Sequence, residues 1–443
     1  MQLDTKIMQM VDEMQAEIVA CRRDIHHYPE MGWTEFRTAS IVATKLKKLG
    51  YTVKTGTEVV HSEYIMGVPD SEVLKQQETR ALNQGADKYW VEKMQGGLTG
   101  VVGILKFSEE GPTVALRFDM DCNEVLESDE KSHYPCKLGF SSANKNNMHA
   151  CGHDGHTAVG LAIAEILAKL KDELSGTVKL IFQPAEEGVR GARAMVESGI
   201  VDDVNYMLGA HFGFKMKTTG TIACNVKGFL ATSKYDAKFE GVPAHAGAAP
   251  EQGKNALLAA ATATLNLHAI ARHSAGSSRI NVGTFKAGSG RNVIPDKAII
   301  QYETRGATSE INEYMERESI RILKSSAMMY DVKLDITKMG GAAGGNNSLQ
   351  LANFIYEKAK SLNIFTEIIG ECDFGASEDF SYFMERVQKN GGYASYIMVG
   401  ANLSAGHHDS YFDFDEKALG YLAKILATVV TSLLNKKLSH ELQ

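Results

Sequence analysis

Four short segments of the chain are almost continuously apolar. Each is too short for a buried helix and is rich in Val, Ile, Leu, Tyr and Phe, which is typical of a buried strand. Between the first two, the stretch HTAVGLAIAEILAKLKDEL has apolar residues at helical spacing. The order strand, helix, strand predicts a parallel sheet and an α/β domain. The four segments are TVALRF (113–118), TVKLIF (177–182), VNYMLGA (204–210) and SYIMVG (395–400).

The pattern changes between residues 228 and 338. The stretch KYDAKFE (234–240) alternates strictly between apolar and charged residues, which predicts a half-exposed strand. The segments that follow predict the order β-α-β-β-α-β, which matches a ferredoxin-like unit. We therefore predict an inserted α+β domain of residues 228–338. The first domain then comprises residues 1–227 and 339–443 and contains a mixed, mostly parallel sheet. The further elements of the insertion are a helix (254–271), strands (279–285 and 297–303), a helix (308–328) and a strand (331–336).

A polar stretch over residues 57–97 belongs to neither pattern. We interpret it as a surface helix on a loop. The histidine pair His26 and His27 lies well before the predicted strand ends, and we interpret it as helix packing.

Length, charge and cysteine spacing exclude several classes of protein. A chain of 443 residues is longer than the chains that usually fold around a single hydrophobic core, which favours two domains. With 47 basic and 54 acidic residues the formal charge is −7, so no nucleic-acid partner is expected. The six scattered cysteines form no C-x-x-C pair, and neither a signal peptide nor a membrane-length apolar run is visible. These features predict a cytoplasmic protein with reduced thiols and no membrane partner.

Polar side chains follow each predicted buried strand. In open α/β sheets, sites form beyond the carboxyl ends of the strands. We therefore expect these side chains to meet at one edge of the sheet. They are Asp119 and Asp121 after the first strand, Glu186 and Glu187 after the second, His211 after the third, and His407 and His408 after the fourth.

The stretch MHACGHDGHTA (148–158) concentrates three histidines and one cysteine in a short loop. A metal site, a redox thiol and a chance grouping in a polar loop are the three interpretations. A redox thiol needs a resolving partner, and no second cysteine lies nearby in the sequence. Hydrolase metals are held by imidazole, carboxylate and thiolate groups, and the strand ends offer all three. In an adjacent pair of glutamates, one can bind metal while the other takes a proton from water.

Six motifs carry a resemblance to a known family. They are DMDCNE, MHACGHDGHTA, FQPAEEG, GVPAHAG, GRNVIP and GASEDFS. With RDIHHYPEMGWTEFRTA before them and HDSYF after them, they extend from about residue 23 to about residue 415. The chain resembles the co-catalytic metallopeptidase family of glutamate carboxypeptidases, aminoacylases and auxin-conjugate hydrolases, within its amidohydrolase branch. The resemblance implies a dinuclear metal site in the α/β domain. It also implies that the inserted domain is a lid that dimerises.

The resemblance assigns a role to individual residues. The family has a ligand histidine in an H-x-D motif at the position where this chain has Asp119. The resemblance implies that His153 supplies the missing imidazole ligand, as is usual in the amidohydrolase branch. HDSYF selects His408 over His407 as a ligand. The two cations would be Mn²⁺ or Zn²⁺. The implied set comprises the general base Glu186, the lid residue His245, the metal ligands Cys151 (bridging), His153, Glu187, His211 and His408, the substrate contacts Asn292 and Arg305, and the supporting residues Asp119 and Asp121.

The resemblance also implies an activity. It predicts metal-dependent hydrolysis of the amide bond of an N-acyl amino acid, with p-aminobenzoyl-glutamate as the expected substrate. Other acetyl, benzoyl or indoleacetyl amino acids are the alternative, and a silent binding protein is disfavoured because the motif residues are intact. The chain would assemble with a related second subunit, as a heteromer, or as a homodimer. Arg305 has a second interpretation, as an ion pair with Glu303 or Glu310.

Overall fold

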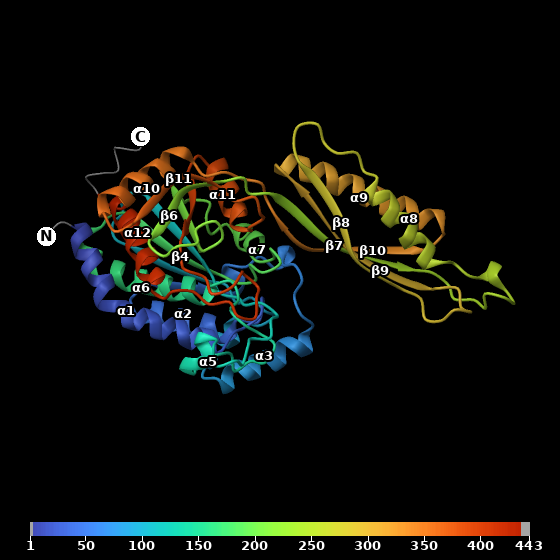
Figure 1. Cartoon of the computed structure of the whole chain (residues 1–443), viewed down its shortest axis with the longest axis horizontal. Helices are drawn as coiled ribbons and strands as arrows, with labels where there is room; N and C mark the ends of the chain where they lie inside the picture. The colour runs from blue at the N-terminus through green and yellow to red at the C-terminus, as the bar shows by residue number, and fades with distance from the viewer. Residues whose placement is uncertain (1–2, 436–443) are drawn as a thin grey trace. The chain divides into compact units, whose positions relative to one another are not determined.

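The computed structural model describes residues 3–435. The chain divides into two compact units, of which unit 1 comprises Met1–Lys227, Asn346–Phe374 and Tyr382–Gln443. Unit 2 comprises Gly228–Gly345 and Gly375–Ser381 (Figure 1). Within the described part of the chain, no helix has the length and apolar character needed to cross a membrane.

Unit 1 contains an eight-stranded mixed sheet in the order β1-β2-β4-β3-β5-β12-β6-β11. Four of its seven neighbouring strand pairs are parallel, so the expected mixed, mostly parallel sheet is confirmed. The four apolar segments form β3, β4, β5 and β12 in its centre. The strands are β1 (Thr52–Thr55), β2 (Val101–Lys106), β3 (Thr113–Asp119), β4 (Thr177–Gln183), β5 (Tyr206–Phe212), β6 (Thr221–Lys227), β11 (Glu367–Asp373) and β12 (Tyr393–Val399).

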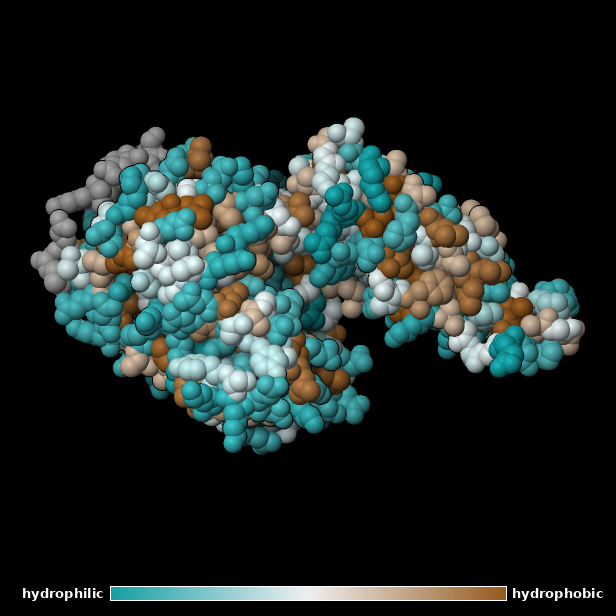
Figure 2. All heavy atoms as spheres, in the orientation of Figure 1, coloured by the Kyte–Doolittle hydropathy of each residue, from teal (hydrophilic) through white to brown (hydrophobic). Residues whose placement is uncertain are grey.

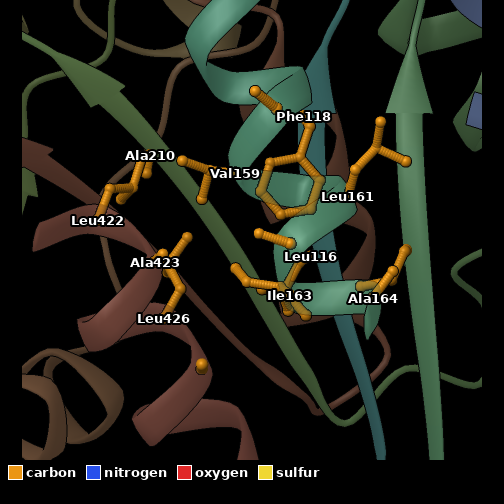
Figure 3. Packing of buried hydrophobic residues seen from close by; sticks show 14 of the residues in the cluster. Leu116, Phe118, Val159, Leu161, Ile163, Ala164, Ala210, Leu422, Ala423 and Leu426 are labelled. Atoms are coloured by element: carbon orange, nitrogen blue, oxygen red, sulfur yellow. The ribbon is translucent and has the colours of Figure 1, made fainter. Parts of the chain in front are cut away.

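Helix α6 connects β3 to β4 and packs directly on the sheet, between α1 and α12 (Figure 1). Its close approach depends on Gly160, where a Cβ atom would lie 2.7 Å from Phe118. Leu116 and Phe118 of β3, Ile163 of α6 and Leu426 of α12 are in the same buried cluster (Figure 3). The helices of unit 1 are α1 (Leu3–His27), α2 (Phe36–Lys48), α3 (Ser71–Asn83), α4 (Lys88–Lys93), α5 (Tyr134–Leu138), α6 (His153–Lys169), α7 (Ala192–Val196), α10 (Leu349–Leu362) and α12 (Lys417–Leu433), and α11 (Phe380–Lys389) begins in unit 2 and continues in unit 1.

Unit 2 is an antiparallel four-stranded sheet in the order β10-β7-β9-β8. Its helices α8 and α9 pack on each other and on the sheet (Figure 1). The chain order β-α-β-β-α-β is the predicted ferredoxin-like order. The elements are β7 (Ala231–Glu240), α8 (Ala256–His268), β8 (Ser278–Ala287), β9 (Lys297–Gly306), α9 (Ser309–Met329) and β10 (Lys333–Ala342).

The chain leaves unit 2 later than residue 338, the boundary that the sequence predicts. Strand β10 continues to pair with β7 as far as Ala342, and a register shift between Lys338 and Gly340 carries the strand across the glycine pair. The short segment Gly375–Ser381 also belongs to unit 2, where the Leu230 N–H donates to the Ala376 carbonyl oxygen at 2.9 Å. The main segment of unit 2 therefore extends as far as Gly345.

Some apolar side chains of unit 2 remain on its surface. Figure 2 shows apolar residues among polar ones over helices α8 and α9, where Leu265 and Met328 are 76% and 80% exposed.

The interpretation of residues 57–97 as a surface helix on a loop is wrong in part. Helix α3 is largely exposed, but Ala81, Trp90, Val91 and Met94 belong to the main core of unit 1. The Trp33 indole N–H donates to the Met66 carbonyl oxygen at 2.7 Å. Hence this segment is built into unit 1.

Candidate active site

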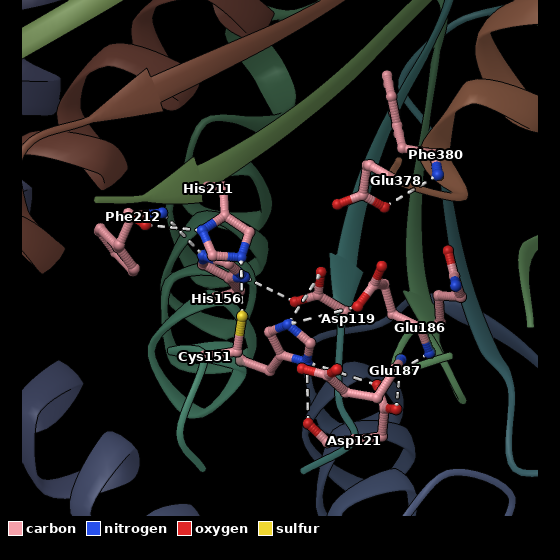
Figure 4. Close-up of polar contacts among 12 residues, drawn as sticks. Asp119, Asp121, Cys151, His156, Glu186, Glu187, His211, Phe212, Glu378 and Phe380 are labelled. Atoms are coloured by element: carbon pink, nitrogen blue, oxygen red, sulfur yellow. Dashed lines mark hydrogen bonds and ion pairs between the residues drawn. The ribbon is translucent and has the colours of Figure 1, made fainter. Parts of the chain in front are cut away.

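The predicted site residues of unit 1 meet where three parallel strands end. Strands β3 and β4 are paired up to Asp119 and Gln183, so the Asp119 and Glu186 segments follow neighbouring strands. His211 lies near the end of β5, and helix α6 begins at His153 after Gly152, whose φ is +92°. Figure 4 shows the side chains of Asp119, Glu186 and His211 converging at this edge. The expectation that polar strand ends gather at one place is therefore correct for unit 1.

Buried donor atoms of Cys151, His153, His211 and Glu187 fall into overlapping groups that could hold a metal ion. Those of Cys151, His153 and Glu187 all lie within 4.8 Å of one another, and Cys151 Sγ is 3.5 Å from His211 Nε2. The Nδ1–H of His153 donates to the Asp121 carbonyl oxygen at 2.9 Å. That of His211 donates to the Phe212 carbonyl oxygen at 2.7 Å. Such bonds fix the tautomer and leave each Nε2 lone pair for a cation.

The charges of these groups also fit a cation. Burial, reinforced by Glu187, raises the pKa of the Cys151 thiol well above its usual range, so a thiolate here requires a compensating positive charge. Burial and the neighbouring His156 lower the pKa of His211, which keeps that imidazole neutral. Burial alone raises the pKa of Glu187, but the nearby His408 and His153 lower it to about 2. His153 Nε2 is buried and has no hydrogen-bond partner among residues 3–435.

Asp119 is hydrogen-bonded to one histidine and lies near a second. Its Oδ1 accepts from the Nδ1–H of His156 at 2.6 Å, and its Oδ2 lies 3.8 Å from His153 Nε2. Burial alone raises the pKa of Asp119, but His153, Arg117 and His156 lower it well below its usual range. His156 was not predicted as a site residue. Its signal in the sequence is its spacing of three from His153, which places both on one side of α6.

Asp121 holds the glutamate pair through the backbone. Its two carboxylate oxygens accept from the N–H groups of Glu186 at 3.0 Å and Glu187 at 2.9 Å (Figure 4). The Arg190 guanidinium donates to the Glu187 carbonyl oxygen and to the Gly67 carbonyl oxygen, both at 2.9 Å. The turn that carries the two glutamates is thus fixed on two sides.

Both His407 and His408 lie near the donor atoms. His408 Nε2 is 3.4 Å from Glu187 Oε1, while the donor atoms of His407 and Cys151 lie within 4.8 Å of each other. The Nε2–H of His407 donates to the Phe212 carbonyl oxygen at 3.2 Å, and its ring stacks on Phe214. The geometry brings His408 to the glutamate, and His407 packs behind His211.

Two of the predicted residues of unit 2 lie next to each other. The N–H of Ala246 donates to the Asn292 carbonyl oxygen at 2.9 Å, and His245 forms a bridge with Val293. His245 is exposed, and its Nδ1 accepts from the N–H groups of Gly247 and Ala248 at 3.1 Å. These two bonds assign the ring proton to Nε2, which makes this nitrogen a hydrogen-bond donor.

Arg305 lies at the other end of the same sheet. Lys297 pairs with Glu240, at the His245 end of β9, whereas Arg305 pairs with Thr232. Eight residues of strand separate the two ends by about 26 Å. The Arg305 guanidinium donates to both Glu303 carboxylate oxygens, at 2.9 and 3.2 Å. This is one of the ion pairs in the second interpretation of Arg305.

A buried charge network surrounds Asp154, at the start of helix α6. Arg22 is fully buried and forms ion pairs with Asp154 at 2.8 Å and Asp413 at 2.6 Å. The two ring nitrogens of His26 donate to Asp154 at 2.8 Å and Glu127 at 3.0 Å. The interpretation of His26 as helix packing alone is therefore wrong, because it contacts the residue that follows His153.

The stability of the fold is expected to depend on the protonation of His26. Burial alone lowers the pKa of His26, but Asp154 and Glu127 raise it to about 9 from 6.5. The resulting stabilisation is complete below about pH 6.5 and is lost as the pH rises through 9, on the order of 3 kcal/mol. Urea unfolding of the wild type and of His26→Gln from pH 6 to 10 checks this. The free energy difference between the two should shrink with rising pH, and parallel curves would contradict the assignment.

The comparisons with known proteins agree with this geometry. The model of Peptidase family M20/M25/M40 matches residues 115–432. The chain is 47% identical to one of the subunits of p-aminobenzoyl-glutamate hydrolase of Escherichia coli, over 95% of this chain and 96% of that protein. It is 46% identical to indole-3-acetyl-aspartic acid hydrolase of Enterobacter agglomerans, over 94% and 96%.

A solved structure is similar over nearly the whole length. The aminobenzoyl-glutamate utilization protein from Klebsiella pneumoniae has a TM-score of 0.82 and 38% identity, with 97% of this chain and 98% of that chain covered. The family resemblance that the motifs carry is confirmed. This chain belongs to Peptidase family M20/M25/M40.

Proposed function

We propose that this protein hydrolyses the amide bond of an N-acyl amino acid, and that p-aminobenzoyl-glutamate is its substrate, giving p-aminobenzoate and glutamate. The observation that carries the proposal is the buried set of sulfur, nitrogen and oxygen donors beside a second carboxylate, Glu186. The names of the relatives from Escherichia coli and Klebsiella pneumoniae support the substrate.

Five residues would hold two divalent cations, Mn²⁺ or Zn²⁺. Lewis-acid activation of the scissile carbonyl and of water near neutral pH is the chemistry that such a pair supplies. The soft Cys151 sulfur and the imidazoles suit Zn²⁺, while the carboxylate also accepts Mn²⁺. The proposed ligands are Cys151, His153, Glu187, His211 and His408.

Replacing Cys151 by serine is expected to weaken metal binding by at least 10–100-fold, the loss that even an outer partner of a metal ligand causes. A hydroxyl is not ionised at neutral pH as a bridging thiolate is. Elemental analysis after dialysis against a graded chelator measures the effect. Cys224→Ser is the matched control, since Cys224 is also buried but lies in the core. Unchanged metal content with lost thiol reactivity would favour the redox interpretation.

Glu186 is the proposed general base. It accepts a proton from the attacking water and returns it to the nitrogen of the leaving amine as the C–N bond breaks. Its Oε2 lies 3.9 Å from His153 Nε2, and Asp121 fixes its backbone. Because its backbone is fixed, the Glu186 side chain leaves the turn from a defined position before the substrate binds.

Unit 2 would supply the groups that recognise the substrate. The Nε2–H of His245 is the proposed donor to the oxyanion, and Asn292 beside it is a proposed substrate contact. Arg305 would bind the substrate carboxylate, in exchange for Glu303, through its planar fork. Since His245 and Arg305 lie at opposite ends of one sheet, contact of both with one substrate requires two chains. A homodimer or a heteromer with a related second subunit would provide them.

A second candidate function is hydrolysis of other N-acyl amino acids. The 46% identity to an indole-3-acetyl-aspartic acid hydrolase favours it. The test compares kcat/KM for p-aminobenzoyl-glutamate, indole-3-acetyl-aspartate, acetyl-glutamate and benzoyl-glycine, with the metal-loaded chain alone and in the presence of a related second subunit. We expect p-aminobenzoyl-glutamate to be cleaved fastest. Much faster cleavage of an acetyl or indoleacetyl amino acid would replace the first proposal with the second.

A further inference from the structure

Glu35 has a fully buried carboxyl group that the proposed reaction does not use. It belongs to the N-terminal motif and lies just before helix α2. Its Oε1 accepts from the backbone N–H of Ala185 at 2.8 Å. Its Oε2 accepts from the Thr99 hydroxyl at 2.6 Å. Both oxygens of this carboxyl group are therefore hydrogen-bonded, one of them to the residue that precedes the proposed base.

Ala185 has a φ angle of +52°, a backbone conformation that residues other than glycine rarely adopt. Such a conformation persists only where neighbouring groups enforce it. The backbone N–H of Ala185 donates a hydrogen bond to Glu35, and the next two backbone N–H groups donate to Asp121. Gly32 lies against the same turn, because a Cβ atom there would be 2.9 Å from the Ala185 Cα. Three consecutive peptide N–H groups are thus held by the buried side chains of Glu35 and Asp121.

We propose that Glu35 is a positioning residue, which holds the Ala185 peptide and thereby sets the direction in which Glu186 and Glu187 leave the turn. The consequence for turnover rests on the proposed function, whereas the consequence for the turn does not. Displacement of a reacting group by about 1 Å can cost 10²-fold in rate. A support directly behind the proposed base therefore has a large expected effect without touching the substrate.

The alternative role for Glu35 is that of a helix cap for α2, and its contacts argue against this role. Glu35 makes no side-chain hydrogen bond to the helix start. The Glu30 side chain binds the start of α2 instead. Its two oxygens accept from the backbone N–H groups of Arg37 at 3.0 Å and Thr38 at 2.7 Å. Glu30 is thus the capping carboxylate of the same motif. It is a matched control, because it is also buried but its side chain binds α2 and Arg80 rather than Ala185.

The experiment compares Glu35→Ala, Glu35→Gln and Glu30→Gln in the metal-loaded full chain. For Glu35→Ala we expect kcat on p-aminobenzoyl-glutamate to fall about 100-fold with little change in KM. Glu35→Gln keeps an oxygen that can accept from Ala185 and should retain kcat within about threefold. Glu30→Gln should lower the unfolding temperature and leave kcat near that of the wild type.

A second measurement does not depend on activity. Amide hydrogen exchange over residues 183–190, read by mass spectrometry, should be faster in Glu35→Ala and unchanged in Glu30→Gln, because only the first change releases the Ala185 N–H. If Glu35→Ala does not fold, Thr99→Val removes the other partner of Glu35 and should produce the same two effects in weaker form. Unchanged exchange in a folded Glu35→Ala overturns the proposal. Faster exchange in a protein that cleaves none of the amides would uphold the positioning role and refute the proposed function.

Discussion

Replacing Glu186 by glutamine is expected to reduce kcat by about 10²–10⁴-fold while the protein keeps its metal ions. The change preserves the shape of the side chain and removes only its ability to accept a proton. Because Asp121 binds the backbone N–H of residue 186 and not its side chain, the turn should keep its geometry. Turnover of p-aminobenzoyl-glutamate and elemental analysis of the same preparation measure the two effects.

The control for Glu186→Gln is the same change at the neighbouring position. Glu187→Gln removes a proposed ligand, so its loss of activity should be accompanied by loss of metal. The two adjacent variants therefore separate proton transfer from metal binding. A Glu186→Gln protein that turns over at nearly the wild-type rate with its metal bound would show that another group is the base.

The sequence predicted the part of the fold that depends on continuous apolar runs. Strands β3, β4, β5 and β12 are buried on both faces, and their runs of Val, Ile, Leu and Phe are visible without a structure. Strand β11, in contrast, is largely exposed and reads EIIGECD, with three acidic residues. Such a strand pairs at the edge of a sheet through its backbone, and this leaves little pattern in its side chains.

The candidate site was predictable where residues lie at strand ends and not where distant segments meet. Asp119, Glu186 and His211 could be placed together because parallel strands end at one edge. Glu35 and His26 could not, since a glutamate or histidine in a polar stretch resembles solvated surface. Their contacts with Ala185 and Asp154 cross 150 and 128 residues of sequence, respectively. The supports of a site are therefore harder to predict than its ligands.

His245→Ala is expected to reduce kcat by about 10²–10³-fold, although His245 lies in unit 2. Removing one hydrogen-bond donor to a developing oxyanion costs roughly 3–4 kcal/mol. Two backbone N–H groups donate to Nδ1 of His245 and so place the ring proton on Nε2, where it can donate to the oxyanion. The matched control is His268→Ala, another histidine of unit 2, at the end of α8. Equal activity of the two variants would identify His245 as an ordinary surface histidine.

Mixing two inactive chains tests whether His245 acts on the site of another chain. In a hybrid dimer of His245→Ala and Glu186→Gln chains, the site with an intact Glu186 receives His245 from the partner. Half of randomly mixed dimers are hybrid and each has one complete site, so about one quarter of the wild-type activity should return. The separation between Arg305 and the end of β9 nearest His245 favours this outcome, because one rigid sheet cannot bring both of its ends to one substrate. If demonstrably mixed dimers stay inactive, His245 acts within its own chain or on a different protein.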